Sequence, residues 1–481
     1  MHDALKLFAV VAVLLLGTRS VAWGEGPRPG SKVFPYAVST TTLPNGLSVV
    51  AVPFDSPGLV AYWTVVRAGS RNEIEPGRSG FAHFFEHMMF RGTERHPKER
   101  YNAILKELGA DHNAFTTDDY TAYHILGPAT ALETMMSIEA DRFMNLKYSV
   151  EDFKKEAGAV LGEYNKNASH PFLTMHETLR DAAFTTHTYR HTTIGFLKDV
   201  RDMPNQYEYS LQFFDRYYRP ENCILLVVGD VEAKALFEKA ARHYGGWKKG
   251  SHRFTVPAEP EQKKEKRVEA VWPTPTQPYL FAGYHGPAFS TSAIDLPALD
   301  LLAQLIFAEA APLYQRLVVD EQVADILAGG AADHRDPYLF TILARVKRPE
   351  DLGRVESAIA QAIEELKAGE VPKDRLERVK SHLKYSYAMG LDTAGSVARS
   401  LAHYLALTGD PDSVNRLYAL YERVTAEDVR SAARRYLTPD NRTTVTLRHA
   451  PAPDGGVAAD EETGAEERGA AAAEGSGGGL R

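Results

Sequence analysis

The stretch His83-Phe84-Phe85-Glu86-His87 places two histidines and a glutamate inside a short apolar run. At 3.6 residues per turn, these three polar side chains share an arc of roughly 100°, and the phenylalanines cover the opposite face. Imidazoles at positions i and i+4 can direct their nitrogens at one metal ion, and the carboxylate between them can reach a water on that ion. The stretch therefore predicts a helix with one packed face and one metal-binding face. The alternative is a helix whose polar side is simply solvated.

Length and composition limit the classes to which the protein can belong. A chain of 481 residues is too long for one hydrophobic core and indicates two to four domains. The 55 basic and 63 acidic side chains give a net charge of −8, so there is no electrostatic reason to expect binding to nucleic acid or to an anionic membrane. Because the chain has only one cysteine, Cys223, it cannot form an intrachain disulfide. Cys223 lies in an apolar run typical of a buried strand.

The N-terminus predicts a secretory signal peptide over residues 1–24. Lys6 precedes an apolar stretch, residues 7–16, that is too short to span a bilayer comfortably, and Ser20 and Ala22 fit the small-residue rule for cleavage. We therefore expect an exported protein, periplasmic or secreted, with no stable membrane span after cleavage. An uncleaved anchor is the alternative.

A second helix follows Ser149, a residue typical of helix N-termini. Its residues Glu156 and Glu163 are two turns apart, so they lie on one line at the margin of its apolar stripe. Carboxylates placed there are partly buried and need a cation or strong donors; solvated glutamates are the alternative. His187 and His191 are also four residues apart, but their neighbours disfavour a helix, so we expect no metal site there.

The order of elements in the second half resembles that in the first. A strand at 60–67 precedes the helix of His83, and a strand at 279–284 precedes an apolar helix at 296–307 without metal-binding residues. We therefore expect an α+β protein with two related domains, each a mainly antiparallel sheet covered by helices. The expected organisation is a Gly- and Pro-rich tether at 25–38, a first domain at 39–245, a linker with solvated basic residues at 246–268, a second domain at 269–450 and a disordered tail at 451–481.

The chain resembles the pitrilysin-type zinc peptidases, which carry the inverted zinc motif H-x-x-E-H. The similarity is to the branch of short chains that includes mitochondrial processing peptidase and its bacterial heterodimeric relatives, whose domain pairs form half of a clam-shell. It covers roughly residues 40 to 440. The motifs that recur in the family's order are Leu43–Leu47, Ala68–Arg71, Gly80–Thr93, Asn113-Ala114, Glu139–Arg142 and Tyr218–Asn222.

The resemblance implies one zinc ion per chain. The family places a glutamate ligand within a narrow range of spacings after the second histidine, and Glu163 falls within that range. His83, His87 and Glu163 would bind the zinc and leave one position to water. Glu156 would orient the ligands from behind, and Glu86 would act as the catalytic general base.

The resemblance also implies a peptide substrate and a partner. Asn113 and Ala114 would lie on an edge strand to which an extended peptide adds through backbone hydrogen bonds; a plain exposed edge is the alternative. The family uses an arginine and a tyrosine of the second half to hold the substrate carbonyl, and Val318 and Asp325 occupy those positions here. Neither can donate to a developing oxyanion at neutral pH. We therefore expect a heterodimer whose homologous partner supplies the Arg/Tyr pair, with a homodimer as the alternative.

The function predicted from the sequence is that of a zinc-dependent endopeptidase, the catalytic subunit of the expected heterodimer, acting on peptides or unfolded protein segments. A non-catalytic structural subunit of a peptidase-like complex and a zinc hydrolase of other substrates stay open as alternatives. Retention of the whole set of polar residues favours the enzyme, because a scaffold has no physical need of Glu86. The sequence does not indicate which substrate side chains are preferred.

Overall fold

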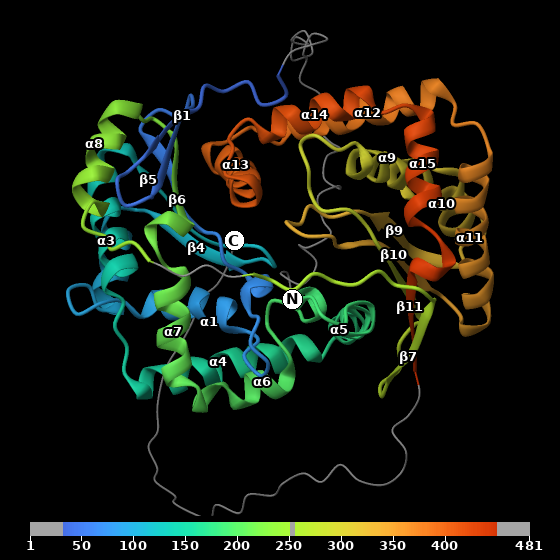
Figure 1. Ribbon diagram of the computed structural model, residues 1–481, viewed down its shortest axis with the longest axis horizontal. Helices are drawn as coiled ribbons and strands as arrows, with labels where there is room; N and C mark the ends of the chain where they lie inside the picture. The colour runs from blue at the N-terminus through green and yellow to red at the C-terminus, as the bar shows by residue number, and fades with distance from the viewer. Residues whose placement is uncertain (1–31, 251–254, 450–481) are drawn as a thin grey trace, which may run out of the picture.

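The structure is a computed structural model that describes residues 32–250 and 255–449. The signal peptide predicted at 1–24 and the tail predicted at 451–481 lie outside the described residues, as does the first part of the predicted tether. The described residues form two sheets, each covered by helices (Figure 1), which confirms the predicted α+β class.

The first sheet has six strands in the order β1-β2-β6-β3-β5-β4. Its strands are β1 (Ser39–Thr42), β2 (Ser48–Pro53), β3 (Leu59–Val66), β4 (Asp111–Thr116), β5 (Thr121–Pro128) and β6 (Cys223–Gly229). The turn at Asn45 and Gly46 joins β1 to β2, and Cys223 on β6 is buried, as its apolar run predicts. β2 and β6 pair in parallel, and the other neighbours are antiparallel. β4 pairs only with β5 and forms one edge of the sheet.

The second sheet repeats this arrangement in the order β7-β11-β8-β10-β9. Its strands are β7 (Lys266–Trp272), β8 (Tyr279–His285), β9 (Ala324–Gly330), β10 (Leu339–Val346) and β11 (Arg442–His449). β7 pairs with β11 in parallel as β2 does with β6, and β9 occupies the edge that corresponds to β4. The order of strands therefore shows the internal repeat that was predicted.

Seven helices of the first half cover one face of the first sheet and form a core with it. They are α1 (Phe81–Met88), α2 (Lys98–Glu107), α3 (Leu132–Asn145), α4 (Val150–Ala168), α6 (Leu197–Asp202), α7 (Tyr207–Tyr217) and α8 (Ala233–Tyr244). Strand residues alternate between this core and the opposite face, as Tyr62 and Trp63 on β3 illustrate.

Each half sends one helix to the other sheet. Helix α5 (Pro171–Ala183), which was not predicted, packs against β7, β8 and β11, and α13 (Ala394–Thr408) packs against β3 and β6 (Figure 1). Arg67, directly after β3, donates from Nε to the carbonyl of Ala406 at 2.9 Å. This exchange makes the two halves share a core, so α13 forms part of the surroundings of the first sheet.

The predicted tether is wrong for residues 32–38. Val33 and Phe34 are buried in the core shared with the second half. The Phe34 N–H donates to Asn415 Oδ1 at 3.0 Å, and the Tyr36 hydroxyl donates to the Leu391 carbonyl at 2.9 Å. This segment therefore fastens the start of the first sheet to helices of the second half.

The predicted linker is shorter and less solvated than expected. β7 begins at Lys266, whose Nζ donates to the Ala182 carbonyl at 2.7 Å, and Arg267 pairs with Glu356 at 2.6 Å. Glu259 accepts three backbone N–H bonds from residues 185–187 at 2.7–2.8 Å. The expectation of solvated basic residues is therefore wrong for Lys266, whereas Arg267 is exposed beside Glu356.

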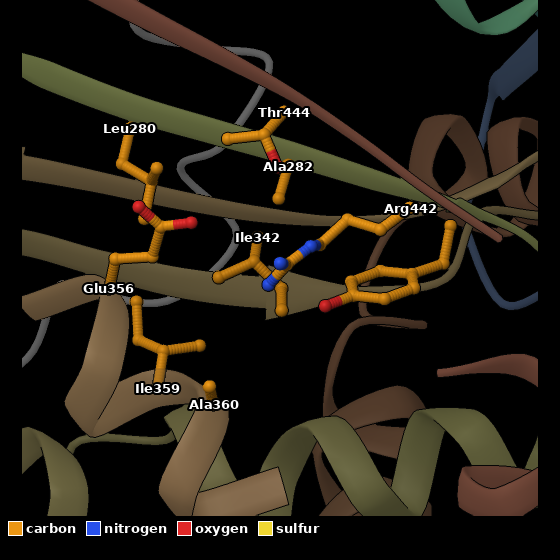
Figure 2. Close-up of a pocket in the computed structure, with 9 residues that line it drawn as sticks. Leu280, Ala282, Ile342, Glu356, Ile359, Ala360, Arg442 and Thr444 are labelled. Carbon is orange, nitrogen blue, oxygen red and sulfur yellow. The ribbon is translucent and has the colours of Figure 1, made fainter. Parts of the chain in front are cut away.

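The remaining helices pack on the second sheet or on the helices α9 and α11 that cover it. They are α9 (Asp295–Phe307), α10 (Pro312–Tyr314), a π-helix (Gln315–Asp320), α11 (Leu352–Ala368), α12 (Lys373–Met389), α14 (Ser413–Arg423) and α15 (Ala426–Tyr436). Among the described residues, α13 to α15 follow α12 and end before Leu437. Figure 2 shows how closely α11 packs on the sheet, since only a cavity of about 10 Å³ separates Ile342 from Ile359 and Ala360.

One helical run, residues 295–320, is long and apolar enough to cross a membrane by length and composition alone. It comprises α9, α10 and the π-helix. Of its apolar window, 67% is buried within the protein, as in the core helix of a folded domain.

Candidate metal centre

Helix α1 begins at a position that only glycine fits. Gly80 has φ +94°, and a Cβ there would lie 2.7 Å from the Ile194 carbonyl oxygen. Since Gly80 has no side chain to cap the helix, the Glu73 carboxylate accepts the N–H groups of Gly80 and Ala82, both at 2.7 Å. Burial raises the pKa of Glu73 well above its ordinary value, although these two donors oppose the shift.

The two faces of α1 differ as its sequence predicts. Phe81, Phe84, Phe85 and Met88 are fully buried, and Phe85 stacks on a ring of α7. On the other face His83 is 9% exposed, and Glu86 and His87 are half-buried. The packed face fixes the direction in which the polar face points.

Helix α4 supplies the carboxylates opposite α1. Ser149 caps it in a capping box with Asp152. Glu163 Oε2 lies 3.5 Å from His83 Nε2 and 3.3 Å from His87 Nε2. The ligand atoms of these three residues all lie within 4.8 Å of one another, and no other such group of three was found in the described part of the chain.

These distances fit a zinc ion. Zinc binds imidazole nitrogen and carboxylate oxygen at about 2.0–2.2 Å, so neighbouring ligands of a tetrahedral ion lie about 3.3–3.5 Å apart. The two distances from Glu163 fall in that range. The donor set of two histidines and one glutamate is also that of catalytic zinc sites that leave one position open.

Glu156 holds the second histidine from behind. His87 Nδ1 donates to Glu156 Oε1 at 3.1 Å, which leaves His87 Nε2 facing Glu163. Arg91, in the 3₁₀ turn that follows α1, donates to the other oxygen of Glu156 through both Nε and its terminal nitrogen. A carboxylate between a histidine and an arginine is the arrangement that fixes the ring of a metal ligand.

The two histidines differ in protonation. Burial lowers the pKa of His83. Burial also acts to lower the pKa of His87, but its hydrogen bonds to Glu156 and Glu163 outweigh this and raise the pKa to about 10. The pKa of Glu163 is lowered, first by its bond to His87. A protonated His87 can donate from Nδ1 to Glu156 and from Nε2 to Glu163, one N–H for each carboxylate.

Glu86 connects α1 to the edge strand. Its Oε2 accepts a hydrogen bond from Thr116 Oγ1 at 2.7 Å, and Thr116 is the last residue of β4. The predicted residues Asn113 and Ala114 lie in the middle of that strand, which pairs with β5 on one side only. The structure therefore places the expected base next to an open sheet edge.

The hydrogen-bond pattern shows which groups of β4 face outward. The Thr117 N–H donates to the Tyr120 carbonyl and closes the hairpin. Because bonded and non-bonded pairs alternate in an antiparallel ladder, the backbone groups of Ala114 and Thr116 point away from β5. The Ala114 N–H is bonded to Asn113 Oδ1 at 2.9 Å, which is consistent with that direction.

Asp118, which no sequence pattern indicated, fixes the end of the edge strand. Its carboxylate accepts from Arg180 of α5 at 2.7 Å and from His334 Nε2 at 3.1 Å. Burial acts to raise the pKa of Asp118, but these partners outweigh it and hold the pKa well below its ordinary value. Ser70, on the turn before α1, donates to the same side chain at 2.7 Å. The turn of the β4–β5 hairpin is therefore tied to both halves.

The second half carries no obvious donor at the positions of the expected arginine and tyrosine. Val318 lies on the π-helix and packs against the core. Asp325 lies on β9 and accepts two bonds from Arg345, at 2.8 and 2.9 Å. His187 and His191, which were not expected to bind metal, flank a 3₁₀ turn and make other contacts, with Asp336 and the Thr192 carbonyl.

Comparison with known proteins supplies the family. The model named Insulinase (Peptidase family M16) matches residues 50–195, and the model named Peptidase M16 inactive domain matches residues 206–383. The first match includes the candidate metal centre, and the two matches together include most strands of both sheets but neither β1 nor β11. The chain belongs to the M16 peptidase family. This confirms the resemblance to pitrilysin-type zinc peptidases that the motifs indicated.

Several known proteins are similar to this chain over most of its length. The zinc protease PqqE of Helicobacter pylori is 27% identical over 419 residues, which cover 85% of this chain and 92% of that protein. The mitochondrial-processing peptidase subunit beta of Caenorhabditis elegans is 24% identical over 420 residues, which cover 85% of this chain and 89% of that protein. A crystal structure of a protease from Helicobacter pylori superposes with a TM-score of 0.80 and 26% identity, over 86% of this chain and 99% of that one.

Proposed function

We propose that this M16 protein is a zinc-dependent endopeptidase that cleaves peptides or unfolded protein segments bound as an added β-strand. The observation that carries the proposal is the spacing of His83, His87 and Glu163 at zinc-ligand distances, with Glu86 bonded to the edge strand beside them. The names of related proteins agree with a zinc-dependent protease.

Each polar residue of the centre has a role in this proposal. His83, His87 and Glu163 would hold one zinc ion, which when bound supplies a Lewis acid that polarises the scissile carbonyl and lowers the pKa of a water. Glu86 takes the proton from the attacking water and passes it to the leaving amine. Glu156 fixes the orientation of the His87 ring by accepting a hydrogen bond from His87 Nδ1.

The substrate would pair with β4. The outward backbone groups of Ala114 and Thr116 offer the hydrogen bonds of a new strand. The bond from Ala114 N–H to Asn113 Oδ1 must open or be shared when a peptide carbonyl arrives. Because Thr116 also contacts Glu86, pairing with this part of β4 would bring a peptide bond close to the base.

The chain would be the catalytic subunit of a heterodimer. Val318 has no donor, and the Asp325 carboxylate is taken up by Arg345, so neither supports an oxyanion. A homologous partner with the Arg/Tyr pair would complete the site, and relatives named as beta subunits are consistent with such a role. A homodimer is the alternative, and export to the periplasm, which rests on residues 1–24, stays a prediction.

The test is cleavage of a mixed peptide library by the zinc-loaded chain, read by mass spectrometry, alone and with a homologue that carries the Arg/Tyr pair. We expect weak cleavage alone and a large increase that follows formation of the complex on size exclusion. The Glu86→Gln chain mixed with the same partner is the control. Full activity of the monomer would overturn the proposal that a partner is needed. Absence of cleavage both alone and in the complex would favour a structural subunit.

A further inference from the structure

The face of the first sheet opposite the metal centre carries a row of rings that ends at the open edge. Trp63 on β3 stacks on His124 of β5, with ring centroids 4.7 Å apart. Phe115 on the edge strand β4 meets Trp63 edge-on at 5.9 Å, and Tyr120 meets Phe115 at 5.9 Å. The row therefore reaches the strand on which the proposed function places the substrate.

Arg399 of α13 lies over this row. Its guanidinium carbon is 4.9 Å from the Phe115 ring and 5.5 Å from the Trp63 ring, which are cation–π distances. The side chain is exposed, and no ion pair or hydrogen bond to it was found within residues 32–250 and 255–449. Burial and the nearby Arg399 charge lower the pKa of His124 to about 4, so His124 is neutral at pH 7. Among the described residues, the guanidinium thus has no direct acidic partner, and its positive charge lies beside the sheet edge.

The register of β4 decides which substrate side chain meets this charge. Ala114 and Thr116 point their side chains toward the α1 core and Glu86, whereas Phe115 points toward Arg399. A peptide that pairs with the outward groups of Ala114 and Thr116 places one residue opposite Phe115, with its side chain on the same face and its Cβ about 5 Å from that of Phe115. That side chain is then within reach of the Arg399 guanidinium.

We propose that Arg399 is a specificity-determining residue that favours an acidic side chain, aspartate or glutamate, at the substrate position opposite Phe115. The inference rests on the proposed function for the position of the substrate strand. A guanidinium binds a carboxylate through paired N–H donors, and the Phe115 ring beneath Arg399 holds the plane of the guanidinium. A lysine at the substrate position opposite Phe115 is repelled by the positive charge of Arg399. Since Thr116, the next residue, contacts Glu86, the selected position lies close to the bond that is cleaved.

Arg399 comes from the second half, so the exchanged helix α13 would contribute to substrate selection by the first. The competing reading is that Arg399 only fastens α13 to the sheet through its ring contacts. The two readings differ in what a substitution changes. Selection predicts a change in substrate charge preference, whereas fastening predicts a change in stability alone.

The test uses peptide sets that are identical except for Glu, Gln or Lys at one position, scanned along the peptide. For the zinc-loaded full chain we expect kcat/KM to favour Glu over Lys by about tenfold at one position, because each partly exposed charge contact changes binding by roughly threefold. Arg399→Gln should bring this ratio close to one, and Arg399→Glu should reverse it. Arg435→Gln is the matched control, since Arg435 is an exposed arginine over the Tyr436 ring, on α15.

A binding measurement separates this inference from the proposed function. The same peptides, fluorescently labelled, are titrated onto the zinc-loaded Glu86→Gln chain and followed by anisotropy. A Glu-over-Lys preference that Arg399→Gln removes supports the inference, even if the wild type cleaves none of the peptides and the peptidase proposal fails. Cleavage or binding without charge preference, a preference that Arg399→Gln leaves unchanged, or no binding at all overturns the inference.

Discussion

Replacing Glu156 tests whether the metal centre depends on a residue that would not contact the metal. The carboxylate has two oxygens and two partners, His87 on one and Arg91 on the other. Glu156→Gln keeps the shape but leaves one acceptor oxygen for these two donors, because the amide nitrogen is itself a donor. Either His87 loses the bond that orients its ring or the Arg91 guanidinium is left without its carboxylate.

The size of the effect follows from these contacts. A hydrogen bond with a charged partner contributes about 1.5–3 kcal/mol, which corresponds to roughly 10- to 100-fold in zinc affinity. Loss of a carboxylate behind a metal-binding histidine has effects of the same order. We expect about tenfold weaker zinc binding for Glu156→Gln, since the amide oxygen can still accept from His87, and nearer 100-fold for Glu156→Ala.

Zinc affinity is measured by competition with a chromophoric chelator at pH 7. Glu151→Gln, at an exposed position of the same helix, is the control and should bind zinc as the wild type does. Circular dichroism shows whether each variant is folded. Unchanged zinc affinity in a folded Glu156→Ala chain would refute the role given to Glu156.

Two further predictions concern the elements that position the centre. Gly80→Ala should lower the free energy of unfolding by about 2–3 kcal/mol, because its φ is +94° and its Cβ would lie 2.7 Å from the Ile194 carbonyl. Gly77→Ala, with φ +76° and no atom near its Cβ, should cost only about 1–2 kcal/mol in the same urea titration; equal losses would contradict the steric argument. Asp118→Asn should destabilise the protein by about 3 kcal/mol at pH 7, since Arg180 then loses its buried partner. Because the pKa of Asp118 in the folded protein lies below the ordinary 3.8, its contribution is present above that pH and is lost as the pH falls below it, so the difference from the wild type should shrink in urea titrations at pH 3. A difference that stays constant from pH 7 to pH 3 would contradict this ion pair.

Much of the centre could be predicted because it lies on two helices. Periodicity places His83 with His87 and Glu156 with Glu163, and those spacings are visible in the sequence. That the two helices face each other followed from the family resemblance alone. Arg91 lies beyond the end of α1, in a turn whose geometry no periodicity describes.

The contacts of Asp118 and Arg399 could not be predicted, because they join segments far apart in the chain. Asp118 meets residues 62 and 216 positions away. Arg399 meets the first sheet only because α13 crosses to it from the second half. Nothing local in the sequence marks either partner.

The missed elements show where local patterns fail. Helix α5 has Pro171 in its first turn and buried Met175 and Leu179 at helical spacing, so a signal was present. Strand β9 is rich in alanine and glycine, which favour strands weakly, and its pairing with β10 decides its structure. In the predicted tether, Val33 and Phe34 are buried, but the surrounding glycines and prolines favoured an unstructured segment.

The central claim is that the cluster on α1 and α4 is a zinc peptidase centre in which Glu86 is the base. The most direct measurement compares zinc content with peptide cleavage for the wild type and Glu86→Gln, in the assembly that cleaves peptides. The account predicts one zinc ion per chain in both proteins and a loss of turnover of roughly 10²- to 10⁴-fold in the variant. Cleavage by Glu86→Gln at the wild-type rate, or a wild type that binds no zinc, would contradict it.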